Sequence, residues 1–67
     1  MNVGQLVMID GDEYEVTRIG RPDGEDTLIT VVPTHGYPVG QRMTLRRVVD
    51  LINAERWMPV NKEEGSV

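Results

Sequence analysis

Apolar and polar residues alternate along the first part of the chain in the way that a β-hairpin requires. Residues 5–10 form a short apolar run, and the dipeptide Asp10-Gly11 at its end is typical of a tight hairpin turn. Residues 13–19 then alternate, with Tyr14 and Val16 on one face of a strand and Glu15 and Thr17 on the other. This pattern predicts two antiparallel strands joined by a short turn.

Turn-forming and β-branched segments follow one another further along the chain. The segment 20–24 is dense in glycine and proline, which favour turns, and the segment 27–32 is rich in β-branched residues. Two prolines and two glycines within 33–40 exclude the interior of a regular element and predict a loop. We expect a third strand at 27–32 and a fourth strand at 41–44, beyond this loop.

The spacing of apolar residues changes after position 44. Four of them lie at i, i+3, i+4 and i+7 and form one stripe of a helix: Leu45, Val48, Val49 and Ile52. Thr44 is a suitable N-cap, and Pro59 lies beyond the expected end of the helix. However, two arginines in the first turn and the adjacent valines disfavour a helix here. The alternative is a longer strand at 41–49, followed by a helical turn and a short strand at 57–60.

Together these elements predict a mainly β fold with one C-terminal helix, built on a small, bent antiparallel sheet of three to five strands. Residues 1–60 form a single small domain in this prediction. Residues 61–67 are polar, contain glycine and lack periodicity, so we expect a disordered tail there.

Length and composition limit the chemistry that the chain can carry out. The chain has 67 residues and no cysteine. A domain of this size has little interior for a deep catalytic pocket, and without cysteine it forms neither disulfides nor thiolate metal sites. Its longest apolar run is the four residues 6–9, well below the roughly 20 residues that cross a bilayer. We expect a cytoplasmic protein without a membrane segment, monomeric or weakly dimeric.

Charge is distributed unevenly along the chain. The formal net charge is −4, but residues 1–33 carry −5 and residues 34–67 carry +1. Six of the seven basic residues are arginines, which suit planar recognition of carboxylates. The cluster Arg42, Arg46 and Arg47 is a candidate contact for an acidic protein surface or for phosphate, and the alternative is a solvated face balanced by nearby acids. The net acidity disfavours non-specific binding to nucleic acid.

The few aromatic residues and the single histidine are the other candidate contacts. His35 and Tyr37 lie in the proline- and glycine-rich loop, where each is either a solvated loop residue or a contact for a partner. Trp57 stands between Arg56 and Met58, a combination that suits an interface hot spot. Because the chain has no phenylalanine, Trp57 is also its largest apolar side chain for a core, so both roles stay open.

The sequence contains no recognisable group of residues for catalysis or for binding a metal or cofactor. His35 is the single histidine and Ser66 the single serine, in the expected tail, which excludes a two-histidine metal site and argues against a catalytic triad. The acidic residues lack the spacing of a calcium loop, and the paired glycines lack the lysine of a phosphate loop. We therefore predict no catalytic residue, no metal and no cofactor.

The first hairpin resembles that of a known class of small domain. Its pattern G-x-L-V-x-I-D-G-x-x-Y-x-V, at residues 4–16, is similar to the opening hairpin of SH3-like barrels, such as the N-terminal barrel of elongation factor P and KOW-type barrels. The functional lysine on a barrel loop of that factor has no counterpart here, because the only lysine is Lys62. The resemblance implies an SH3-like barrel that docks on nucleoprotein machines such as the ribosome or RNA polymerase.

The leading functional hypothesis is a non-enzymatic protein-binding regulator or adaptor that docks on a larger host complex, with the transcription machinery as one candidate. Its short, acidic, cysteine-free format is similar to that of small phage-encoded proteins that modify host machinery. The alternative is an RNA- or DNA-binding barrel, in which the arginines contact phosphate and Tyr37 stacks on a base. A third hypothesis is an enzyme of a small-barrel type whose pore forms only on oligomerisation.

Overall fold

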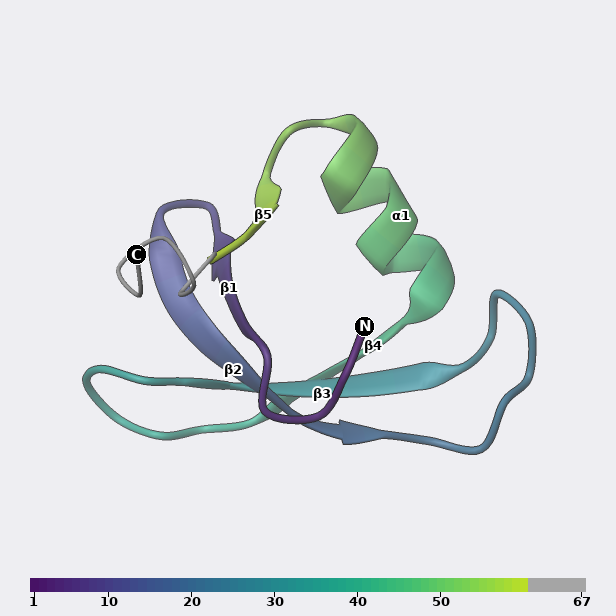
Figure 1. The fold of residues 1–67 in the computed structure, drawn as a ribbon, viewed down its shortest axis with the longest axis horizontal. Helices are drawn as coiled ribbons and strands as arrows, with labels where there is room; N and C mark the ends of the chain where they lie inside the picture. The colour runs from purple at the N-terminus through teal and green to yellow at the C-terminus, as the bar shows by residue number, and fades with distance from the viewer. Residues whose placement is uncertain (61–67) are drawn as a thin grey trace, which may run out of the picture.

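The computed structural model describes residues 1–60 and shows a mainly β fold with a single helix, which confirms the fold class predicted from the sequence (Figure 1). The elements are β1 (Leu6–Ile9), β2 (Asp12–Ile19), β3 (Leu28–Pro33), β4 (Gln41–Thr44), α1 (Leu45–Asn53) and β5 (Trp57–Pro59). Among these residues no helix has the length and apolar character needed to cross a bilayer. The tail expected at 61–67 lies outside the described residues.

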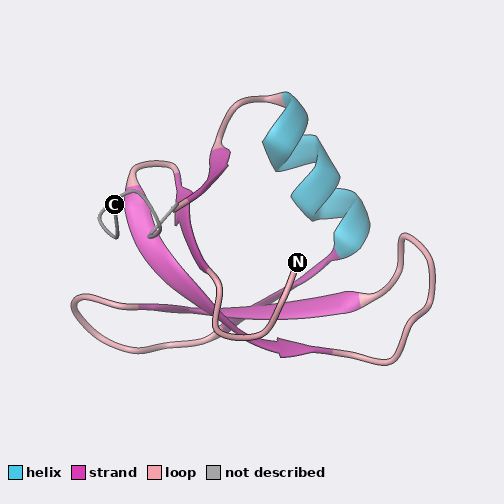
Figure 2. Cartoon of the chain, viewed as in Figure 1, coloured by secondary structure: helices cyan, strands magenta, loops and turns pink. Residues whose placement is uncertain are grey.

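All five strands belong to one open antiparallel sheet with the order β4-β3-β2-β1-β5. Helix α1 follows one edge strand, β4, and precedes the other edge strand, β5. The helix therefore connects the two edges, and Figure 2 shows it lying across the open side of the curved sheet. This arrangement covers the apolar face of the sheet with the only helix among residues 1–60.

The predicted first hairpin forms with a two-residue turn. Asp10 and Gly11 both have positive φ, 52° and 90°, as a type I′ turn requires, and the register places Ile9 opposite Asp12. Aspartate tolerates this left-handed conformation better than most residues, and glycine adopts it without strain. The dipeptide therefore sets the register of β1 against β2, which is why the hairpin could be predicted from the sequence.

Helix α1 begins directly after β4, so the longer strand considered for 41–49 is not formed. The backbone N–H of Arg47 donates to Thr44 Oγ1 at 3.2 Å, and Thr44 is the N-cap as predicted. The cap satisfies one of the backbone donors that the first turn leaves without an intrahelical partner.

The buried side of α1 is rotated relative to the predicted stripe. Val48 and Leu51 are buried, whereas Val49 and Ile52, two members of the predicted stripe, are exposed. Leu51 was not part of that stripe. The half-buried Leu45 completes the buried side, which therefore follows the apolar spacing 45, 48 and 51.

The core takes side chains from β1, β2, β3, α1 and β5. Its eight buried residues are Val7, Ile9, Val16, Ile29, Val31, Val48, Leu51 and Trp57. Trp57 is only 4% exposed, so its indole belongs to this core and is not available as a partner contact. Of the two roles left open by the sequence, the structure shows the core role, because β5 places Trp57 on the inner face of the sheet while Met58 points outward.

A β-bulge interrupts the alternation of β2. Val16 lies opposite Val31 but Arg18 lies opposite Thr30, so two steps along β2 correspond to one step along β3. Beyond this bulge Ile19 packs against the core and Arg18 is exposed. A regular strand would have aimed Arg18 into the core and Ile19 outward, and no pattern in the sequence indicated the bulge.

The C-terminal end of α1 forms a Schellman motif without glycine. The N–H of Arg56 donates to the carbonyl of Leu51 at 2.8 Å, and the N–H of Glu55 donates to the carbonyl of Ile52 at 3.0 Å. This geometry requires a left-handed residue, and Glu55 supplies it with φ of 60°. A side chain in this conformation costs free energy that glycine does not pay.

The substitution Glu55→Gly is expected to raise the free energy of unfolding by about 1 kcal/mol, because it removes the steric strain of the left-handed residue. Urea unfolding followed by circular dichroism measures the change. Glu55→Ala is the matched control, since it removes the same charge but keeps the Cβ atom. Equal stability of the two variants would contradict the explanation.

Candidate functional site

The three arginines predicted as one cluster do not form one surface. Arg46 lies against the loop between β2 and β3, with its Nη2 atom 3.3 Å from Glu25 Oε1 and 3.7 Å from Asp26 Oδ1. Its charge is therefore locally balanced. Arg42 and Arg47, in contrast, make no ion pair with any carboxylate of residues 1–60, and both line a single surface pocket.

This pocket of about 470 Å³ lies between the β1–β2 turn, the edge strand β4 and helix α1. We call it the edge groove. Its floor is apolar and consists of buried or half-buried side chains: Ile9, Tyr14, Met43 and Leu51. Its rim is charged and exposed and contains Arg42, Arg47 and Arg56 together with Asp10 and Asp12. The groove thus combines guanidinium donors with an apolar, partly aromatic surface.

An ion pair fixes one wall of the edge groove. Arg56 donates from Nε to Asp10 Oδ1 at 2.7 Å and from Nη2 to Asp10 Oδ2 at 2.9 Å. The backbone N–H of Asp10 also donates to the carbonyl of Arg56 at 3.0 Å. These three bonds join the β1–β2 turn to the segment before β5, and the bidentate geometry is the strong form of this interaction.

The same ion pair shifts the titration of both partners. The hydrogen bond from Arg56 holds the pKa of Asp10 below its ordinary value of 3.8, and the Asp10 carboxylate raises the pKa of Arg56. The pKa of Asp10 is lower in the folded state than in the unfolded state, so the ion pair stabilises the folded protein at pH values above the unfolded-state pKa. This stabilisation is lost as the pH falls through the folded-state pKa.

The substitution Asp10→Asn is expected to lower the urea midpoint at pH 7 and to flatten its decline below about pH 4, because the titrating partner of Arg56 is gone. Asparagine still adopts the left-handed conformation of the turn, so the hairpin is kept. The measurement compares urea midpoints of the two proteins between neutral and strongly acidic pH. Parallel declines in both proteins would show that Asp10 does not contribute.

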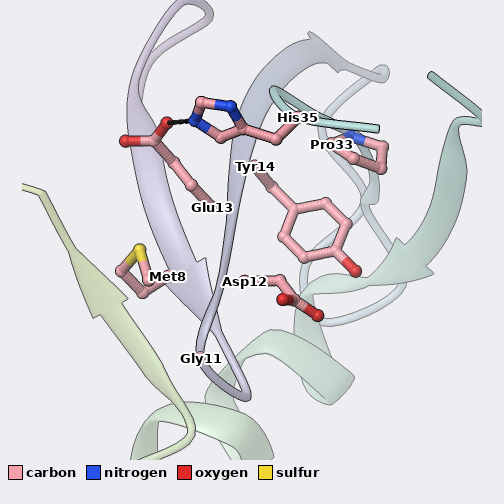
Figure 3. A pocket seen from close by; sticks show the side chains of 7 residues that line it. All are labelled: Met8, Gly11, Asp12, Glu13, Tyr14, Pro33 and His35. Carbon is pink, nitrogen blue, oxygen red and sulfur yellow. Dashed lines mark ion pairs between the residues drawn. The ribbon is translucent and has the colours of Figure 1, made fainter. Parts of the chain in front are cut away.

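A second pocket, of about 550 Å³, lies beside the β1–β2 turn and contains His35 (Figure 3). His35 Nε2 lies 3.4 Å from Glu13 Oε1, and Thr34 Oγ1 donates to the same Glu13 oxygen at 2.6 Å. Figure 3 shows the Tyr14 ring turned away from this pair, toward Asp12. The His35 side chain is largely exposed, and Glu13 tethers the loop to β2.

Tyr37 is the most exposed large apolar side chain among residues 1–60, at 85%. It lies in the loop between β3 and β4. This loop is attached to the sheet near the β1–β2 turn, because Pro33 pairs with Tyr14 and the N–H of Thr34 donates to the carbonyl of Glu13 at 3.1 Å. Figure 1 shows this loop and the β1–β2 turn at the same end of the molecule. Tyr37 and the edge groove therefore share one end of the sheet.

The structure thus brings together part of the predicted site. Arg42 and Arg47 line the edge groove, and His35 and Tyr37 lie at the same end, whereas Arg46 is paired elsewhere and Trp57 is buried. Tyr14 and Met43 in the groove floor were not among the predicted site residues, because both have the spacing of ordinary core residues. The pairing of Arg56 with Asp10 was also not predicted, since the two are 46 positions apart.

This end of the molecule combines arginine side chains with an apolar groove floor. Within residues 1–60 no three histidine, aspartate or glutamate side chains gather in a way that could hold a metal ion. Comparison of the chain with protein-family models, curated proteins and solved structures finds no match. Function is therefore inferred from the site: arginines around an apolar floor, with an exposed tyrosine in the β3–β4 loop, suit contact with another protein.

Proposed function

We propose that this protein is a non-enzymatic protein-binding regulator or adaptor that docks through the sheet end formed by the edge groove and the Tyr37 loop. The observation that carries the proposal is the apolar edge groove bordered by Arg47, which makes no ion pair with the carboxylates of residues 1–60. The exposed Tyr37 stands in the β3–β4 loop, on the side of the molecule where the β1–β2 turn lies. Tyrosine and arginine are enriched in interface hot spots, and the half-buried Tyr14 and Met43 offer a surface for an apolar side chain of the partner.

The proposal extends to the type of domain and of partner. The strand order β4-β3-β2-β1-β5, with the helix between β4 and β5, supports the SH3-like barrel suggested by the resemblance of the first hairpin. We propose that this barrel docks on a larger cytoplasmic complex such as the ribosome or RNA polymerase, in the manner of small phage-encoded proteins. A small domain whose stability is marginal on its own gains stability when a partner binds its folded form.

Binding of RNA or DNA at this end is the less favoured function. Asp10 and Asp12 stand on the same rim as the arginines, so a phosphate backbone would meet carboxylates as well as guanidinium groups. A carboxylate-bearing protein partner can instead pair with single arginines and place apolar side chains in the groove.

Affinity capture from a cell lysate tests the proposed function. The protein is expected to retain a stoichiometric protein complex, and the double variant Tyr37→Ala/Arg47→Glu is expected to bind it at least about 30-fold more weakly, as the loss of a hot spot implies. Arg46→Gln is the control, because Arg46 is paired outside the groove.

Both variants must first show the urea midpoint of the wild-type protein, so that loss of binding is not loss of folding. Unchanged capture by the double variant would overturn the proposed site. Recovery of nucleic acid alone, released by nuclease treatment, would favour the alternative function.

A further inference from the structure

A second cationic surface lies on the outer face of the sheet, opposite the core. Arg18 on β2 and Arg42 on β4 both lie directly across from Thr30 on β3, so the three residues form one row across three strands. Arg21, from the loop after β2, lines the same surface pocket of about 670 Å³. We call Arg18, Arg21, Arg42 and Thr30 the outer arginine face.

The bulge in β2 is what creates this row. Without it, Thr17 would lie opposite Thr30, and Arg18 would point toward the core. The bulge adds one residue, so Thr17 and Arg18 are both exposed and Arg18 reaches the register of Arg42. Bulges commonly re-aim a side chain near a functional site.

The spacing of the row suits a single small anionic group. Neighbouring strands are about 5 Å apart, so the Cα atoms of Arg18 and Arg42 stand roughly 10 Å apart with Thr30 midway between them. An extended arginine side chain is longer than one strand spacing. Both guanidinium groups can therefore converge above Thr30, where its hydroxyl adds a further donor.

The charges of this face are not neutralised within the described part of the chain. Arg18, Arg21 and Arg42 are exposed and make no ion pair with the carboxylates of residues 1–60, although the protein has more acids than bases. Arg46 and Arg56, by contrast, each pair with an acid. Three arginines that share one face and have no carboxylate partner among residues 1–60 favour an anion supplied by another molecule.

We propose that the outer arginine face binds an acidic segment of a partner protein, with an aspartate or glutamate carboxylate held between Arg18 and Arg42 above Thr30. Leu28, which is 45% exposed and lines the same pocket, receives an apolar side chain of that segment. The proposal rests on the protein-binding function above and extends it to a second surface and to the chemistry of the partner.

A carboxylate segment fits this face better than a phosphate backbone. A neighbouring pocket is lined by Asp23 and Asp26 together with Arg21 and Leu28. The exposed Glu15 lies on the adjacent part of β2. Carboxylates therefore lie at the borders of the cationic area. A long polyanion would have to pass over these acids. The pocket is lined by threonine, leucine, glycine and arginine, without an aromatic ring on which a base could stack.

Titration of the full chain with a short glutamate-rich peptide containing leucine, followed by amide NMR shifts at low salt, tests the proposal. We expect shifts at Arg18, Thr30 and Arg42. We expect Arg18→Gln to weaken binding about tenfold, as loss of one charge-assisted contact implies. Arg18 is the decisive position, because Arg42 on the edge strand also borders the edge groove whereas Arg18 does not.

Arg46→Gln is the matched control, since it removes one positive charge outside both the outer arginine face and the edge groove, and it is expected to bind the peptide like the wild-type protein. A glutamine version of the peptide is expected not to bind. Three results would overturn the proposal: no binding of the peptide, amide shifts confined to the edge groove, or a weakening of peptide binding by Arg46→Gln equal to that by Arg18→Gln. Tighter binding of an oligothymidylate of equal charge would replace it with a nucleic-acid site.

The two proposals fail separately. In one outcome, a protein complex is captured in a way that depends on Tyr37 and Arg47, but the peptide does not bind at Arg18. This outcome would support the proposed function and overturn only the outer binding site. Peptide binding that depends on Arg18, with no complex captured, would support the outer arginine face while removing the edge groove as the docking site.

Discussion

The packing of helix α1 and β5 over the open side of the sheet is the interaction on which the rest of the structure depends. A five-stranded sheet with one apolar face must bury that face, and this chain has neither cysteine nor phenylalanine to help. Val48, Leu51 and Trp57 supply three of the eight buried core residues from this short stretch. The ion pair between Asp10 and Arg56 and the tight helix end hold the segment in place.

This packing also decides where the charges lie. Because α1 turns its buried side toward the sheet through Val48 and Leu51, Arg46 meets the acids of the β2–β3 loop while Arg47 reaches the edge groove. Two neighbouring arginines in the sequence thus have different surroundings. Arg46 pairs with Glu25 and Asp26, whereas Arg47 makes no ion pair with a carboxylate of residues 1–60.

The edge strand β4 separates the two proposed binding surfaces. Met43 faces the groove and the core, and Arg42 borders both the edge groove and the outer arginine face. A partner segment that crosses this strand can therefore contact both surfaces. Gln41 and Arg42 at the start of this edge strand are exposed, and so is Tyr37 in the loop before it.

Local patterns in the sequence determined the mainly β fold and the hairpin at Asp10-Gly11, because turn conformation and alternation depend on neighbouring residues. They indicated Thr44 as an N-cap but left a longer strand at 41–49 open, and the structure shows the helix. The rotation of α1, the burial of Trp57 and the bulge that exposes Arg18 were decided only by the tertiary structure. These features depend on which surfaces meet across the core. The same holds for the pairing of Arg56 with Asp10, since no local rule joins residues 46 positions apart.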